Sequence, residues 1–136
     1  MTTTSTKAQW ALRLGLGLMY LYSGIDLFRH PTAWHWALPM WLRDIITQFI
    51  SLNNYLKLQG VLEIVIALIF LCWVMPKVIV KFAALISLLE MLGILILAFF
   101  PFSGANFAIT FRDIGLLGAS TALFFLVAGR DDGNYL

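Results

Sequence analysis

Residues 78–100 read VIVKFAALISLLEMLGILILAFF, and Lys81 and Glu90 are the only charged side chains in this stretch. A helix needs about 20 mostly apolar residues to cross a hydrocarbon core of roughly 30 Å. The stretch therefore predicts a membrane-spanning helix. On either side of it, three more stretches have the same character, at residues 10–28, 55–75 and 107–128.

The composition of the whole chain agrees with this pattern. Of its 136 residues, 61% are hydrophobic and 12% are charged, and the mean hydropathy is +0.89. Backbone groups in hydrocarbon must be hydrogen-bonded within their own segment, which favours helices over an open sheet. We predict an all-α integral membrane four-helix bundle that forms a single transmembrane domain over residues 1–136. Short connections predict that the last three spans are antiparallel neighbours.

Charge and cysteine content exclude several function classes. The net charge of +2 is small and forms no basic patch, so nucleic acid is not a predicted partner. Cys72 is the only cysteine, which excludes a dithiol redox centre built from this chain alone. Membrane lipid is the predicted environment.

The connection between the first and second spans is long and rich in tryptophan. Residues 39–50 have the apolar spacing of an amphipathic helix that lies in the headgroup plane. Tryptophan is enriched at membrane interfaces. The predicted interfacial residues are His30, Trp34, His35, Trp36 and Trp41. The two histidines could be read as metal ligands or as donors to a quinone carbonyl, but an interfacial structural role is favoured, and neither a metal site nor a haem is predicted.

Basic residues predict the orientation of the bundle. With four spans, one side holds Lys7, Arg13, Lys77, Lys81 and Arg130, and the other holds Arg29, Arg43, Lys57 and Arg112. The positive-inside rule then places both termini in the cytoplasm of a multi-pass inner-membrane protein.

Polar residues inside the spans are the candidate site. A charged side chain at bilayer depth costs about 2.5 to 3.5 kcal/mol on insertion scales, so each needs a partner or a water-filled cavity. We expect Arg112 to pair with Glu63 or Asp26, Gln59 to extend the network at Glu63, and Arg13 to reach Glu90 or the headgroups. The candidates for this polar cluster are Arg13, Asp26, Gln59, Glu63, Glu90, Arg112 and Asp113.

Two interpretations of the polar cluster stay open. It is either a clasp that fixes the register of four apolar helices or a functional cavity that exchanges protons with a quinone or a transported solute. Small residues are predicted to let helices approach closely. These small residues are Gly15, Gly17, Gly24, Gly93, Gly115, Gly118 and Ala119.

Four short motifs give the chain a family resemblance. They are LRLG at 12–15, SG at 23–24, GVLEI at 60–64 and FRDIGLLG at 111–118. Together with the long Trp-containing and Pro-containing connection, they resemble the DoxX/DoxD family of small four-helix membrane proteins. The matching site positions are Arg13, Glu63, Arg112 and Asp113. At the end of the first span the chain departs from the family, since Asp26 and Arg29 stand where a lysine is expected.

This resemblance implies a membrane partner of redox systems, because the DoxD branch is the membrane subunit of a thiosulfate:quinone oxidoreductase. The leading hypothesis is a small membrane subunit of a redox assembly that handles a quinone or another small hydrophobic ligand. The chain is then at most the membrane subunit of a quinone-linked oxidoreductase, with other membrane or redox subunits, or a second copy of itself, as partners. The alternatives are a non-catalytic scaffold subunit and a small transporter or proton-conducting unit built around Glu63 and Glu90.

Overall fold

The computed structural model describes residues 3–99 and 107–129, and these residues form helices joined by turns, with no strand among them. The elements are α1 (Thr3–Arg29), the 3-10 helix η1 (Pro31–Ala37), α2 (Met40–Thr47), α3 (Leu52–Leu71), α4 (Lys77–Phe99) and α5 (Phe107–Ala128). The prediction of an all-α chain is confirmed. Two of the helical segments, Leu52–Leu71 and Lys77–Leu97, are long and apolar enough to cross a membrane.

Local capping explains where the helices differ from the predicted spans. Helix α3 begins at Leu52 rather than at 55, because the Ser51 side chain accepts a hydrogen bond from the Asn54 backbone and caps the first turn. It ends at Leu71 rather than at 75, since Cys72 has an extended backbone (φ −75°, ψ 121°). Helix α1 extends beyond the predicted span at its N-terminal end, to Thr3.

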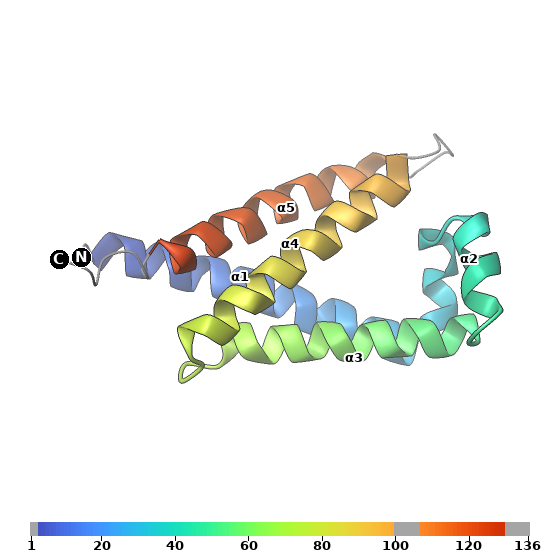
Figure 1. Ribbon diagram of the computed structural model, residues 1–136, viewed down its shortest axis with the longest axis horizontal. Coiled ribbons are helices and arrows are strands. Elements are labelled where there is room, and N and C mark those ends of the chain that lie inside the picture. Colours follow the sequence, from blue (N-terminus) through green and yellow to red (C-terminus); the bar gives the residue numbers. More distant parts are fainter. Residues whose placement is uncertain (1–2, 100–106, 130–136) are drawn as a thin grey trace.

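The long connection contains two helical elements, where the sequence predicted one interfacial helix. Seven residues form η1, which the sequence analysis did not predict, and α2 lies within the predicted segment 39–50. Helix α2 buries none of its residues. A hydrogen bond of 2.7 Å between His35 Nε2 and Asn53 Oδ1 ties η1 to the first turn of α3. The connection therefore packs at one end of the long helices (Figure 1).

The long helices pack as two pairs. The most extensive interface joins α1 to α3, and the next joins α4 to α5. Helix α4 leaves the end of α3 and crosses away from it toward α5, so that α3 and α4 diverge toward the end that carries α2 (Figure 1). Consecutive antiparallel packing thus describes α4 and α5 well, whereas α3 and α4 share only a small interface.

All four long helices contribute to one apolar core. Its fully buried members include Leu16 of α1, Phe70 of α3, Ala84 of α4 and Leu123 of α5. Because side chains from both helix pairs meet there, the core holds the pairs together.

Glycines set the spacing between α1 and α3. A Cβ atom added at Gly24 would lie 2.7 Å from the Gly60 carbonyl oxygen, and one added at Gly60 would lie 2.7 Å from the Gly24 carbonyl oxygen. Gly17 is also closely packed, with the Leu71 side chain 2.8 Å from the position of an added Cβ. These contacts show that the two backbones cross at a distance that only glycine permits.

The other predicted packing glycines are different. An added Cβ would meet nothing within 4 Å at Gly15, Gly93, Gly115 or Gly118. The prediction of close packing is therefore wrong for these four within the chain. Small-residue spacing alone does not distinguish a crossing point from an outward face.

We expect Gly24→Ala to destabilise the fold and Gly15→Ala to leave it intact. The added methyl group at position 24 would meet the Gly60 backbone, so α1 and α3 must separate, at a cost of roughly 1 to 3 kcal/mol. At position 15 there is open space, and alanine improves helix propensity by up to about 1 kcal/mol. Thermal unfolding followed by circular dichroism in detergent measures both effects. Equal midpoints for the two variants would contradict this account of the crossing.

Candidate functional site

A line of buried hydroxyl groups crosses the centre of the bundle. The Tyr20 hydroxyl of α1 donates to Ser87 Oγ of α4 at 2.8 Å. Ser87 Oγ lies 2.8 Å from Ser120 Oγ of α5. All three residues have 0% of their surface exposed. The hydroxyl line, as we call Tyr20, Ser87 and Ser120, therefore joins three helices inside the apolar core.

Glu90 of α4 lies at the α1 end of the hydroxyl line. Electrostatic interaction couples its carboxyl group to the Tyr20 hydroxyl. Gln59 Nε2 of α3 donates a hydrogen bond to Glu90 Oε1. Gln59 was expected to support Glu63, its neighbour one turn along the same helix, but its hydrogen bond crosses to α4 instead. Together with the hydroxyl line, Glu90 and Gln59 connect all four long helices.

Glu63 is the second buried carboxyl group, with 6% of its surface exposed. Its side chain interacts with the Ser23 hydroxyl of α1 and, through its charge, with Glu90. Within the described part of the chain, Glu63 Oε2 and Glu90 Oε2 are buried without a hydrogen-bond partner. A buried carboxylate oxygen is costly unless a donor, a cation or a proton satisfies it. Each of the two groups thus keeps one buried oxygen without a donor among the described residues.

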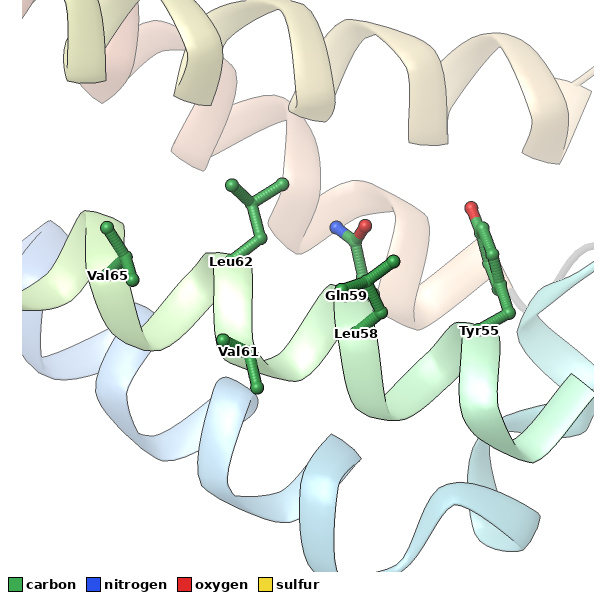
Figure 2. A pocket seen from close by; sticks show the side chains of 6 residues that line it. All are labelled: Tyr55, Leu58, Gln59, Val61, Leu62 and Val65. Atoms are coloured by element: carbon green, nitrogen blue, oxygen red, sulfur yellow. The ribbon is translucent and has the colours of Figure 1, made fainter.

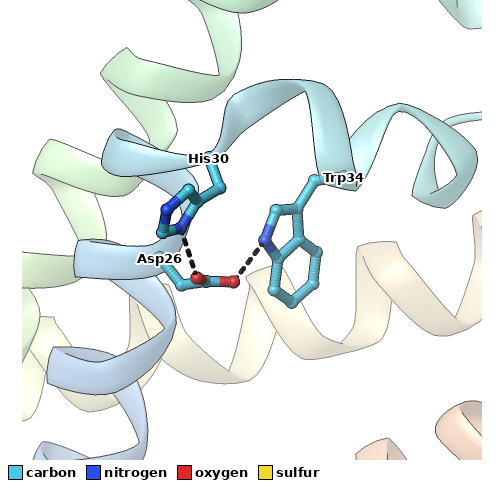
Figure 3. Close-up of polar contacts among 3 residues, drawn as sticks. All are labelled: Asp26, His30 and Trp34. Atoms are coloured by element: carbon cyan, nitrogen blue, oxygen red, sulfur yellow. Dashed lines mark hydrogen bonds and ion pairs between the residues drawn. The ribbon is translucent and has the colours of Figure 1, made fainter.

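Asp26 lies in a separate local cluster (Figure 3). Its Oδ1 atom is 2.9 Å from His30 Nδ1, and its Oδ2 atom accepts a hydrogen bond of 2.8 Å from Trp34 Nε1. Both carboxylate oxygens are used by residues at the junction between α1 and η1, and the predicted pairing of Asp26 with Arg112 stays a prediction. An i,i+4 histidine is within reach of an aspartate near the end of a helix.

Arg13 does not pair with Glu90, and this expectation is also wrong. Its guanidinium donates to three backbone carbonyls where α3 ends, at 2.9 Å to Phe70, 3.1 Å to Ile69 and 2.7 Å to Cys72. The last carbonyls of a helix have no partner within the helix and carry its negative dipole end. The guanidinium is also 4.3 Å from the Trp10 ring centroid, and Trp10 stacks on Trp73. Arg13 therefore fastens α1 to the C-terminal end of α3.

The remaining predicted residues have other surroundings. Asp113 is buried on α5 and has an interaction partner, whereas the side chain of Arg112 lies outside the residues that the structure describes. Trp34 and Trp36 stack with ring centroids 6.2 Å apart. Trp36 and Trp41 are exposed. The predicted pairing of Arg112 with Glu63 or Asp26 thus stays a prediction.

An apolar groove runs along α3 beside the polar residues (Figure 2). Its volume is about 430 Å³, and its described lining residues all belong to α3. Most are aliphatic, and the polar groups are the Tyr55 hydroxyl and the Gln59 amide. The lining residues are Tyr55, Leu58, Gln59, Val61, Leu62 and Val65. Because Gln59 lines the groove and also bonds Glu90, it links the groove to the buried carboxyl groups.

The hydroxyl line was not found from the sequence. A serine or tyrosine within an apolar span is common, and serine can satisfy itself with a carbonyl of its own helix. The signal that remains is weak: Ser87 is three residues before Glu90, on the same face of α4. Among the described residues, no group of three or more His, Cys, Asp and Glu side chains is placed to hold a metal ion.

Comparison of the chain with protein-family models, with characterised proteins and with solved structures gives no match. The candidate site must therefore be interpreted from its own geometry. It combines an apolar groove, an amide donor and two buried carboxyl groups within one bundle.

We expect Arg13→Ala to separate α1 from the end of α3. The change removes three charge-assisted hydrogen bonds and leaves buried carbonyls unsatisfied, a loss on the order of 2 to 4 kcal/mol. Arg13→Lys keeps the charge but not the planar fork of donors, so its loss should be intermediate. Thermal unfolding measures the three proteins. The exposed Arg29 provides the matched control, since Arg29→Ala should change the midpoint little, and an equal loss at both positions would refute the role of Arg13.

Proposed function

We propose that the chain is a small multi-pass membrane protein in which α1, α3, α4 and α5 cross the bilayer, and that its α3 groove binds a quinone or a similar small hydrophobic ligand within a redox assembly. The observation that carries this proposal is the groove itself. It is apolar along its length, and its Gln59 amide is hydrogen-bonded to the buried Glu90 carboxyl group.

The exposed surface supports the membrane setting. Only 33% of the apolar window is buried in each of the two helices long enough to span, whereas the core helix of a water-soluble protein is mostly buried. Large apolar side chains are exposed on all four long helices, among them Leu18 of α1, Leu68 of α3, Phe82 of α4 and Phe125 of α5. Soluble monomers rarely expose apolar surface so continuously. Lipid chains are the environment that suits it.

The charged residues of α1 are compatible with a position of this helix in the bilayer. Arg13 is buried against the α3 carbonyls, and Asp26 is hydrogen-bonded at the junction with η1. Charged side chains within spanning helices are tolerated where they face the protein interior or lie at an interface.

Helix α2 fits the headgroup layer. The exposed side chains of this helix and its last turn include Met40, Trp41, Ile45 and Phe49, and none of its residues is buried. An exposed apolar face of this kind suits the boundary between headgroups and acyl chains. Together with the distribution of basic residues, this placement supports an orientation with both termini and the α3–α4 connection on the cytoplasmic side of an inner membrane.

The groove matches the chemistry of a quinone. A quinone has an apolar ring and tail and two carbonyl oxygens that accept hydrogen bonds. Ligand pockets of this kind are mainly apolar, with a few polar groups that fix orientation. The second Gln59 amide hydrogen and the Tyr55 hydroxyl are the donors that the groove offers. Electrons would come from a redox partner subunit, which agrees with what the resemblance to the DoxX/DoxD family implies.

A scaffold subunit is the second candidate, and one observation favours it. Space is open around Gly115 and Gly118 on α5, which would allow another helix to approach closely. This function requires neither the α3 groove nor its polar residues. Ligand binding therefore separates the two candidates.

Cysteine labelling tests the proposed topology. In a Cys72→Ser background, Lys77→Cys should react with a membrane-impermeant maleimide only after the membrane is opened. Gln48→Cys, at the opposite end of the helices, should react in intact cells or right-side-out vesicles, because both positions are exposed and only their sides differ. Labelling of both positions from one side would overturn the spanning arrangement.

Equilibrium binding of a radiolabelled short-chain ubiquinone to the protein in lipid nanodiscs tests the ligand. Leu62→Trp should fill the groove and weaken binding by at least about tenfold, or 1.4 kcal/mol. Leu68→Trp is the matched control, because Leu68 is exposed on α3 but is not among the lining residues. No specific binding by the native protein, or an equal loss in both variants, would exclude the α3 groove as a quinone site.

A further inference from the structure

The lining of the α3 groove changes character along its length. All the described lining residues belong to one helix, so their order in the sequence is also their order along the groove. The polar members, Tyr55 and Gln59, come from the first two turns of α3. Beyond Gln59 the described lining is aliphatic and ends at Val65. The groove therefore has a polar end and an apolar end.

The two ends lie on one face of α3. Tyr55, Gln59 and Leu62 extend to the same side of the helix (Figure 2), as expected from spacings of four and three residues. The hydrogen bond from Gln59 to Glu90 shows that this side faces α4. An elongated ligand can therefore contact the polar and the aliphatic residues at the same time.

Glu90 holds one of the two polar groups in place. It accepts one Nε2 hydrogen of Gln59, and the amide keeps its second hydrogen and its carbonyl oxygen for another partner. Tyr55 is one turn earlier, about 6 Å along the helix axis, and its hydroxyl group can donate or accept. These two residues, which we call the ring site, are suited to the oxygen atoms of a quinone ring.

The apolar end of the groove is open along one side. Leu62 is 42% exposed and Val65 is 47% exposed. A chain on these two residues, which we call the tail path, would contact α3 on one side and lipid on the other. The groove volume of about 430 Å³ is within the range of roughly 300 to 1,000 Å³ for small-ligand pockets. A long tail can therefore begin in the groove and continue into lipid.

The direction of the groove matches the bilayer. Helix α3 begins at Leu52, at the end of the bundle that carries α2 (Figure 1), and the proposed function places α2 among the headgroups. With a rise of 1.5 Å per residue, Gln59 lies about 10 Å and Val65 about 20 Å from the start of α3. Because the hydrocarbon core is roughly 30 Å thick, the ring site lies nearer the headgroups and the tail path reaches the middle of the core.

We propose that the groove binds a prenylated quinone in one direction, with its ring at the ring site and its tail along the tail path toward the end of α3. This inference rests on the proposed function, because it concerns the same ligand and the same groove. Tyr55 and Gln59 then position the ring, and Val65 determines how well a tail is accepted.

The reverse direction is unfavourable at both ends. It would place the carbonyl oxygens of the ring against Leu62 and Val65, where the described lining offers no donor. It would also cover the amide of Gln59 with a tail that cannot form hydrogen bonds. A polar group that loses water without gaining a partner costs about 1 to 3 kcal/mol.

Binding of two quinones to the protein in lipid nanodiscs tests the direction. One quinone has no tail and the other has two prenyl units on the same ring, and the measured quantity is the ratio of their dissociation constants, prenylated over tail-less. Val65→Trp should obstruct the tail path and raise this ratio about tenfold. Tyr55→Phe removes a hydrogen bond to the ring that both quinones share, so both should bind about three to ten times more weakly at an unchanged ratio.

Leu68→Trp is the matched control for Val65→Trp, because Leu68 is also exposed on α3 but does not line the groove. Its ratio should equal that of the native protein. An unchanged ratio in Val65→Trp, or a raised ratio in Tyr55→Phe, would overturn the proposed direction. Equal displacement of the prenylated quinone by decane would show a general alkyl-chain groove without a ring site, and would overturn it as well.

Photolabelling of the native protein provides a second measurement that needs no variant. A prenylated quinone with an azide on its ring should label residues 55–59, and one with a diazirine at the end of its tail should label α3 from Leu62 onward. The reverse order of labels, or both labels in one segment, would contradict the proposal.

The failure of this inference is distinguishable from the failure of the proposed function. If neither quinone binds the native protein, the quinone function fails and the direction fails with it. If Leu62→Trp abolishes binding but the ratio in Val65→Trp is unchanged, the groove stands as a quinone site and only the direction is wrong.

Discussion

The close crossing of α1 and α3 positions the polar side chains of these two helices relative to each other. At Gly24 and Gly60 the two backbones are so close that an added Cβ on either would touch the other's carbonyl oxygen. This crossing fixes the antiparallel register of the pair. It brings Ser23 beside Glu63, and one turn earlier on α1 it places Tyr20 where its hydroxyl reaches Ser87. The second helix pair then packs on a surface whose polar positions are already set.

Arg13 secures the other end of the same pair. Helix ends leave carbonyl groups unsatisfied, which is costly away from water. A guanidinium carried by α1 satisfies three carbonyls where α3 ends. The guanidinium and the three carbonyls therefore satisfy each other away from water, and Arg13 does not need a carboxylate partner. Pairing by opposite charge considers only side chains, and it missed the acceptors that lie within reach of Arg13, which are backbone carbonyls.

The parts of the fold that depend on hydropathy and local sequence signals could be predicted from the sequence. The all-α chain follows from composition, and the order of long helices follows from four apolar stretches. The predicted partners were wrong where a hydrogen bond depends on the direction in which a side chain leaves its helix. Gln59 and Glu63 are one turn apart, yet Gln59 bonds across to Glu90, and Asp26 finds its partners in η1, an element without a sequence signal. The hydroxyl line could not be predicted from the sequence, because Tyr20, Ser87 and Ser120 form no pattern there. Only the fold brings their hydroxyl groups together, at 2.8 Å from Tyr20 to Ser87 and 2.8 Å from Ser87 to Ser120.

The position of the polar residues argues against a purely structural clasp. A clasp is best made from groups that satisfy each other fully, because every unsatisfied buried group costs stability. Tyr20, Ser87 and Ser120 meet that condition among themselves, but Glu63 and Glu90 each keep a buried oxygen without a partner in the described chain. Two neutral residues would hold the helices in register more cheaply. Glu90 is also connected to the groove, because the Gln59 side chain that bonds it is one of the lining residues.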